Sequence, residues 1–406
     1  MLNAAKADKV LRSVYLDVIA DQIDTTTSPF LNMISKGSED ICGKEVICPA
    51  RFGLNGGIGC GADDSDLPVA SPQTYLALKA PVVNIFGNIE LSDKMLRASQ
   101  NTVGSFVNLL NGEMESLVAA AKFNFARMLF QDGSGKLATI VGTGSTTTVL
   151  TVDTVKNVME GMVIDVVKNK TTAVSTGHKI VAIDRANKTI KLDKAVSDKT
   201  TGNILVLQGS HDAEIYGLPY LYNAASETPT IYGNVRINVS YMLPQTKTVN
   251  AVSTDSVQEL LDDIEERSGG RIDLLLTSYD MRRKYLAALQ STRTNVDYMN
   301  LDGGFKSISY NGIPIYADRF VEDNTIHFVN TADFKLQQLG DWSWIEGEGG
   351  RILRQLDNKA AYGATLVKYA NLICIRPIGQ AKMVYEEPTT TPDQSGNESG
   401  SDTQNG

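Results

Sequence analysis

The dipeptide Asn311-Gly312 is the strongest local constraint in this 406-residue sequence, because it stands between two runs with strand character. A tight β-hairpin turn needs positive φ at both central positions, which asparagine and glycine adopt at low cost. Residues 305–310 alternate apolar and polar side chains, and residues 313–316 continue as a second strand. Pro314 has no N–H to donate, so it suits an edge strand or the first residues of a strand. The stretch is therefore predicted to be a β-hairpin.

Composition indicates a globular protein of two or three domains. Hydrophobic residues make up 42% of the chain and charged residues 21%, which is ordinary for soluble folds. The formal net charge is −9, so the whole chain is not expected to bind nucleic-acid phosphates tightly and without sequence preference. No apolar run approaches the roughly 20 residues that cross a bilayer.

The first 24 residues predict an amphipathic helix. Charged residues are spread through this segment, which excludes the uninterrupted apolar core of a secretory signal. Its apolar residues recur at helical spacing: Leu11, Val14, Tyr15, Val18 and Ile19.

The cysteines and histidines do not predict a metal site. Cysteines occur at 42, 48, 60 and 374 and histidines at 178, 211 and 327, with no Cys-x-x-Cys pair. Zinc sites usually need closely spaced pairs of ligands. We expect reduced thiols and no bound metal.

A long glycine-rich segment at 43–86 predicts an extended arm. Runs with strand character flank it at 45–48 and 75–89, and glycines, acidic residues and prolines fill the middle. Unstructured loops of more than about 15 residues are uncommon and usually functional or disordered. An isolated hairpin is only marginally stable in water, so we expect this arm to lie on another surface.

The next two segments predict a long helix and then a small β module. Apolar residues spaced by three or four run from 102 to 130, and the Asp-Gly-Ser-Gly sequence at 132–135 ends the helix. Short strands at this spacing predict an inserted barrel or sandwich; they fall at 148–152, 162–167, 179–184, 189–193 and 204–207.

From about residue 255 the pattern becomes α/β. Asp255, with Gln258 three residues later, predicts the N-cap of a helix, and Gly269-Gly270 predicts its end. A short strand and a second helix capped by Ser278 follow. Further strands are predicted at 325–329, 335–339 and 364–375. Residues 388–406 contain no aliphatic or aromatic side chain and are predicted to be disordered.

Several residues could carry chemistry, but none forms a catalytic set. The glycines at 57, 59 and 61 resemble a phosphate loop, yet three aspartates follow where a helix N-terminus would be required. Those aspartates lack the spacing of a calcium loop. Trp342 and Trp344 are either packing anchors or a stacking platform for a ligand. Neither catalytic residues nor a cofactor site is predicted.

Four segments, in order along the chain, carry a family resemblance. They are 89–94 (IELSDK), 131–135 (QDGSG), 230–233 (TIYG) and 267–278 (RSGGRIDLLLTS), and they precede the hairpin at 301–318. This order resembles the major capsid proteins of tailed bacteriophages over nearly the whole chain. The resemblance implies an α+β fold of the Hong Kong 97 type, with an N-terminal arm, an extended loop, a spine helix, peripheral and axial domains, and here an inserted small all-β domain.

The resemblance also implies a role for each region. We expect an N-terminal arm (1–42), an extended loop (43–88), a peripheral domain with the spine helix (89–135), the inserted β domain (136–209), a peripheral linker (210–249), an axial domain (250–330), a return to the peripheral and axial sheets (331–387) and a disordered tail (388–406). Expected subunit contacts are Gly56, Gly57, Asp63, Asp64, Leu67, Arg282 and Arg283.

The implied function is assembly of an icosahedral shell from hexamers and pentamers around a double-stranded DNA genome, with no enzymatic activity and no membrane partner. Expected partners are a separate scaffolding protein, a portal and a decoration protein, and the expected location is the virion, after assembly in the host cytoplasm. Scaffolding would come from another protein or from a cleaved segment. Residues 51–78 contain no lysine, so the lysine–asparagine cross-link of some relatives is not carried over.

Two alternatives remain open at this point. One is an encapsulin-like cellular compartment with the same fold. The other is a surface adhesion or carbohydrate-binding protein built around the β module and the two tryptophans.

Overall fold

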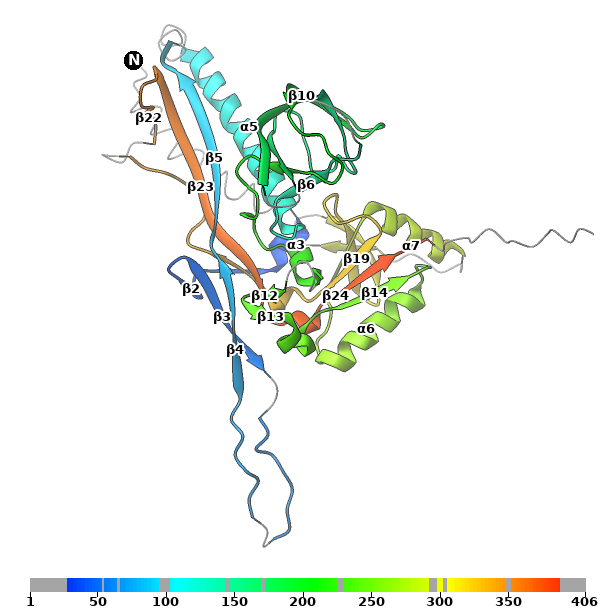
Figure 1. The fold of residues 1–406 in the computed structure, drawn as a ribbon. Coiled ribbons are helices and arrows are strands. Elements are labelled where there is room, and N and C mark those ends of the chain that lie inside the picture. Colours follow the sequence, from blue (N-terminus) through cyan, green and yellow to red (C-terminus); the bar gives the residue numbers. More distant parts are fainter. Residues whose placement is uncertain are drawn as a thin grey trace, which may run out of the picture.

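The computed structural model describes residues 28–52, 55–63, 66–94, 103–142, 147–168, 172–224, 229–291, 298–301, 305–347 and 352–387. These residues form an α+β fold with four visible parts: a long sheet backed by a helix, a small barrel beside that helix, an α/β unit, and a thin hairpin that extends away from the rest (Figure 1). The predicted helix at 1–24 and the predicted tail at 388–406 lie outside the described residues.

A six-stranded sheet around β23 (Ala361–Cys374) forms the long axis of the molecule. β5 (Val83–Ser92) runs antiparallel to it over ten residue pairs. The remaining strands are β20 (Phe334–Gln338), β21 (Ser343–Trp344), β22 (Arg354–Gln355) and β1 (Ser35–Gly37). The strands predicted at 335–339 and 364–375 are confirmed.

Helix α5 (Val103–Leu129) lies along this sheet, as predicted from the spacing of its apolar residues. At 1.5 Å per residue, its 27 residues span about 40 Å. Met114, Phe125 and Leu129 are completely buried against the sheet. Gly133, with φ of 90°, follows the helix in a backbone conformation that suits glycine.

A cluster of aromatic side chains holds the start of the described chain to the end of this helix. Phe30 in α3 (Pro29–Met33) contacts Phe334 edge to face at 5.3 Å between ring centres, and Phe130 lies 6.3 Å away. All three are buried. The remaining short elements are η3 (Leu218–Tyr222), β12 (Thr230–Ile231), β13 (Asn234–Val235), η4 (Arg236–Met242), η5 (Thr331–Asp333) and η7 (Pro377–Gly379).

The inserted module is a six-stranded antiparallel sheet that curls into a barrel beside α5 (Figure 1). Its strands are β6 (Lys136–Thr139), β7 (Thr147–Thr151), β8 (Val163–Lys168), β9 (Thr172–Asp184), β10 (Thr189–Val196) and β11 (Ile204–Leu207). An isolated bridge between Ile140 and Val152 connects the ends of β6 and β7 and closes the curl. Five of these strands were predicted. β6 was missed because its four residues show no clear alternation.

The α/β unit is a seven-stranded sheet in the order β14-β24-β19-β15-β18-β17-β16. Its strands are β14 (Gln245–Val249), β24 (Ala381–Tyr385), β19 (Thr325–Val329), β15 (Leu274–Thr277), β18 (Ile313–Ala317), β17 (Phe305–Tyr310) and β16 (Tyr298–Leu301). Helices α6 (Thr254–Ser268) and α7 (Tyr279–Ser291) pack on it.

The predicted hairpin is confirmed in this sheet. Asn311 and Gly312 have φ of 50° and 78°, as the tight turn requires. Pro314 is the second residue of β18, which is not an edge strand. Pro314 has no N–H to donate, but this costs no hydrogen bond to β15, because the parallel pairing of β18 with β15 begins one residue later, at Ile315.

Both helices of the α/β unit begin at serine caps. The predicted cap at Asp255 is wrong: the Ser253 hydroxyl accepts the Ser256 N–H at 3.1 Å, and the Ser256 hydroxyl accepts the Ser253 N–H at 3.0 Å. A reciprocal pair of this kind satisfies two backbone donors that the helix leaves open. The predicted cap at Ser278 is confirmed by a 3.3 Å bond from the Met281 N–H.

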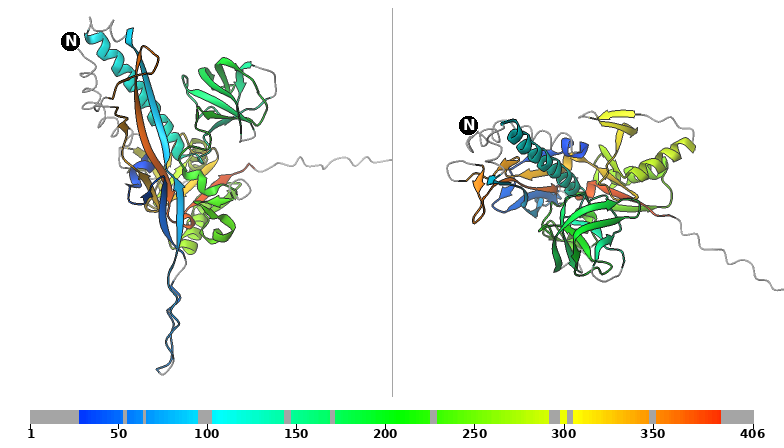
Figure 2. Two further views of the ribbon diagram at one scale, coloured as in Figure 1. Left: turned by 60° about the vertical axis from the view of Figure 1, so that its left-hand side comes forward. Right: turned by 90° about the horizontal axis from the view of Figure 1, so that it is seen from above.

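The predicted arm is a narrow hairpin of β3 (Glu45–Phe52) and β4 (Thr74–Pro81), flanked at its base by β2 (Ile41–Cys42). Figure 2 shows that it extends well beyond the body of the molecule. The single strand expected at 75–89 is wrong. The chain leaves the arm after Pro81, and β5 then pairs with β23 in another sheet.

Candidate subunit-contact surfaces

Glycines in the arm tip allow its two sides to approach each other closely. A Cβ on Gly56 would lie 3.2 Å from the Ser71 side chain, and one on Gly59 would lie 3.0 Å from the Pro68 ring. Gly57 donates its N–H to the Asn55 side chain at 2.8 Å. These glycines therefore keep the tip narrow by omitting side chains.

The arm tip exposes apolar and acidic side chains together. Ile58, Leu67 and Val69 are 90%, 89% and 87% exposed, and Asp63 and Asp66 are also exposed. Aliphatic side chains gathered at such exposure mark surfaces that contact a partner. Asp64, which was predicted to belong to the same surface, lies outside the described residues.

The arm tip does not have the geometry of a phosphate loop. Its glycines at 57, 59 and 61 lie in extended chain, and no helix begins within residues 55–63 or 66–73. A phosphate cradle depends on a helix N-terminus that faces the anion. Among the described residues, no group of three or more His, Cys, Asp or Glu side chains could hold a metal ion.

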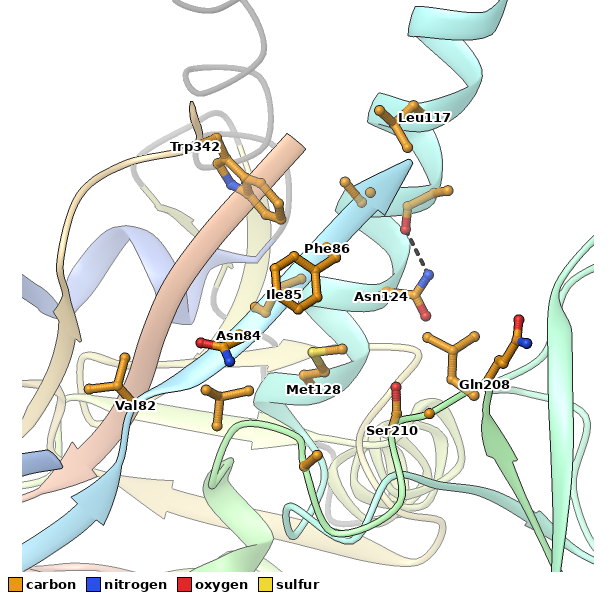
Figure 3. A pocket seen from close by; sticks show the side chains of 17 residues that line it. Val82, Asn84, Ile85, Phe86, Leu117, Asn124, Met128, Gln208, Ser210 and Trp342 are labelled. Atoms are coloured by element: carbon orange, nitrogen blue, oxygen red, sulfur yellow. Dashed lines mark hydrogen bonds between the residues drawn. The ribbon is translucent and has the colours of Figure 1, made fainter. Parts of the chain in front are cut away.

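A groove of about 450 Å³ lies between β5, α5 and the segment that leaves the inserted barrel (Figure 3). The half-exposed Phe86 and the side chains of Leu117 and Met128 line it, together with Gln208 and Ser210 from the barrel exit. All of the lining residues are uncharged. The groove offers apolar contact area and no acid–base pair for catalysis.

The two arginines predicted as contacts lie on the surface of α7. Arg283 pairs with Asp280 at 3.1 Å, and the Arg282 guanidinium lies 5.4 Å from the centre of the Tyr279 ring. Lys284 also pairs with Asp280, at 2.8 Å. The structure places this helix in the α/β unit, away from the arm tip (Figure 1), so one chain does not bring the two sets of predicted contacts together.

The tryptophans are packing anchors. Trp342 and Trp344 are both buried. The Trp342 ring meets Phe125 at 6.0 Å, and the buried Lys368 ammonium lies 5.5 Å from the same ring. The alternative of an exposed stacking platform for a glycan is therefore wrong for this pair.

His327 is buried inside the seven-stranded sheet, where it pairs in register with Leu276 on one side and Lys382 on the other. Its ring lies 5.5 Å from that of Tyr222, and neither ring nitrogen has a hydrogen-bond partner. Burial, with a smaller contribution from Lys382, holds the pKa of His327 well below its usual value. The residue is neutral and structural.

An acidic group that the sequence did not reveal lies where the hairpin ends. Asp318 is buried, and its carboxylate accepts the Phe320 N–H at 3.0 Å. Burial raises the pKa of Asp318 to about 6 despite that hydrogen bond.

The base of the inserted barrel is held by a buried ion pair. Arg127 near the end of α5 makes two parallel bonds to Glu214, at 2.8 and 2.5 Å. Periodicity alone could not reveal this pair, because the two residues lie on either side of the insertion.

Comparison with known proteins identifies the fold of this chain. No protein-family model and no curated protein matches it. Among solved structures, the capsid of cyanophage A-1(L) is similar over 88% of this chain and 92% of that chain, with 12% identity and a TM-score of 0.51. At this identity the likeness establishes the fold alone: the chain has the Hong Kong 97-type capsid fold.

Two other similar structures have lower TM-scores. The SrpI encapsulin from Synechococcus elongatus has 10% identity, coverage of 88% of both chains and a TM-score of 0.43. A structure from Mycobacterium phage Bobi has 9% identity, covers 95% of this chain and 99% of that chain, and has a TM-score of 0.42. No described helix is long and apolar enough to cross a membrane.

Proposed function

We propose that this chain is the major capsid protein of a tailed bacteriophage. It assembles as hexamers and pentamers into an icosahedral shell around a double-stranded DNA genome. The observation that carries this proposal is the arm, which projects from the body of a capsid fold and exposes three aliphatic side chains at its tip (Figures 1 and 2). A two-stranded hairpin with this surface is stabilised by lying on another molecule.

Each part of the fold has a role in that assembly. The arm, within residues 43–88, overlies a neighbouring subunit and spreads contact area beyond the body. Residues 250–330 contribute most of the axial domain, which packs around the capsomer axis with Arg282 and Arg283 at subunit contacts. Many such contacts, each weak alone, sum to a stable shell by multivalency.

The chain acts as a structural protein of the virion, without enzymatic activity of its own. Its net charge of −9 suits a shell that encloses DNA without gripping its phosphates. A separate scaffolding protein, a portal and a decoration protein are the further partners, and the host cytoplasm is the site of assembly.

Electron microscopy of the purified recombinant chain, with its mass measured in solution, tests the proposal. We expect capsomers or closed shells, alone or after addition of a phage scaffolding protein. A chain that stays monomeric under both conditions contradicts the proposal. Tight binding of linear duplex DNA at low salt would contradict the role assigned to its charge.

A further inference from the structure

The inserted barrel carries charge opposite to that of the rest of the chain. Residues 136–209 contain ten lysines and arginines and six aspartates and glutamates, a net charge of +4 within a chain of −9. The remainder therefore carries −13. A basic module on an acidic body suits a contact between copies of the same chain.

The basic residues lie beside exposed aliphatic ones on the outer side of β7, β10 and β9. Lys191 is exposed between Ile190 and Leu192, which are buried in the barrel core, so its side chain points outward. It pairs in register with Val149 of β7. Lys179 and Val181 alternate with the buried Ile180 on β9 and share this outward side. We call Val149, Lys179, Val181 and Lys191 the barrel face.

The barrel face is partly exposed, and its two lysines have no ion-pair partner among the described residues. Val149 and Val181 are 41% and 52% exposed. Asp193, the nearest acid on β10, accepts the backbone N–H of Lys179 at 2.8 Å. Exposed valines next to lysines favour a protein partner over a nucleic acid or an anionic glycan, which would cover only the charges.

The arm tip has the complementary chemistry. Ile58, Leu67 and Val69 are its exposed aliphatic side chains, and Asp63 and Asp66 are its exposed acids. Figure 1 shows the tip far from the barrel, which lies beside α5 on the other side of the body. One chain therefore cannot bring these two surfaces together.

We propose that the arm tip of one copy docks on the barrel face of a second copy. This inference rests on the proposed shell function and deepens it, because it assigns the inserted barrel a place in the subunit contact. The aliphatic side chains lose water together, while Asp63 and Asp66 face Lys179 and Lys191.

A natural thiol in the tip allows a direct test in assembled particles. Cys60 is exposed, and Cys42 is the other exposed cysteine of the described chain. In a Cys42→Ser background, Val181→Cys places a thiol on the barrel face. The matched control is Thr201→Cys, which places an exposed thiol before β11, across the barrel from β9 and β10.

Assembled particles of each variant are treated with oxidised glutathione, and the yield of disulfide-linked oligomers is measured. Val181→Cys particles should give at least about tenfold more oligomers linked through Cys60 than Thr201→Cys particles, because docking raises the effective concentration of the two thiols. Particles that assemble without this difference overturn the docking inference and leave the shell function standing. Failure of the parent chain to assemble overturns both.

Charge exchange provides a second readout. Lys179→Glu with Lys191→Glu should reduce particle yield at low salt, and Asp63→Lys with Asp66→Lys should do the same. A chain with all four substitutions should regain yield relative to either pair, because the opposite charges meet again with exchanged signs. Equal loss in all three variants, or no loss in any, contradicts the docking.

Discussion

Arg127 and Glu214 form a bidentate ion pair in which both side chains are almost completely buried, with bonds of 2.8 and 2.5 Å. The pair connects the end of α5 to the chain that returns from the inserted barrel. Replacing Arg127 by methionine leaves a buried carboxylate without its partner, and such losses cost about 3–5 kcal/mol. We expect Arg127→Met to lower the free energy of unfolding by this amount in urea titrations.

The exposed pair of Lys168 and Asp198, at 3.1 Å, is the matched control for that experiment. Lys168→Met should cost less than about 1 kcal/mol, because solvent screens exposed pairs. Arg127→Met combined with Glu214→Leu should recover much of the loss, since neither buried charge remains. Equal costs for Arg127→Met and Lys168→Met would show that the buried pair does not hold the barrel base.

Removing the arm tip should abolish assembly and leave the folded body intact. Phe52 pairs with Thr74, so an Asn-Gly turn can join these residues in place of 53–73. We expect thermal unfolding within a few degrees of the parent chain and loss of capsomers and shells in electron microscopy. Shells of normal yield from the shortened chain would contradict the role of the arm.

The buried His327 makes the protein sensitive to mild acid. The folded-state pKa of His327 is depressed, so below about pH 6.5 the unfolded chain takes up a proton that the folded chain does not. Stability therefore falls as pH decreases through that value, by up to about 1.4 kcal/mol per pH unit from this residue. His327→Phe should lose less stability than the parent between pH 7.5 and 5.5, measured by thermal unfolding.

Val329→Ala is the control for that comparison. Val329 is buried in the same strand but does not titrate, so its substitution should lower stability by a similar amount at both pH values. If His327→Phe shows the same acid sensitivity as the parent, other groups are responsible for it.

Asp318 has the opposite pH dependence. Its pKa is raised from 3.8 to about 6, so the folded protein holds this proton more tightly than the unfolded chain. The contribution of Asp318 to stability is largest below about pH 4 and is lost as pH rises through about 6. Asp318→Asn removes the buried charge and keeps an oxygen for the Phe320 N–H.

We expect Asp318→Asn to gain about 2–3 kcal/mol at pH 8 and almost nothing at pH 4, measured by urea unfolding at both values. Asp184→Asn is the contrasting variant. The pKa of Asp184 is lowered, mainly by its hydrogen bonds to Asn187, so its removal should not stabilise the protein at pH 8. A uniform gain at both pH values for Asp318→Asn would exclude the pKa as the cause.

Local signals in the sequence predict the elements whose causes are local. Asn311-Gly312 defines its own turn, and the apolar spacing of α5 predicts that helix almost to the residue. β14 and β24 were missed because they are short and partly polar, and their parallel pairing depends on residues about 136 positions apart, as in Gln245↔Ala381. Ser253 was overlooked as a cap because Asp255 fits the same pattern two residues later.

The candidate contact surfaces could be located from the sequence only in part, for a different reason. The glycine-rich composition located the arm tip, including Gly56, Gly57 and Leu67. The groove around Phe86 is assembled from β5, α5 and the barrel exit, which no single stretch of sequence reveals. Burial of Trp342 likewise depends on Phe125, more than two hundred positions earlier.

Strands late in the sequence complete both large sheets of the body. β23 pairs with β5 from Ala361↔Ser92 onward, and β24, which ends at Tyr385, inserts between β14 and β19. Both large sheets therefore stay incomplete until the final strands leave the ribosome, and closing such distant pairs is slow. The arm is thus synthesised long before the body that carries it can fold, so in the proposed shell the arm of a growing chain is not yet anchored to a folded subunit.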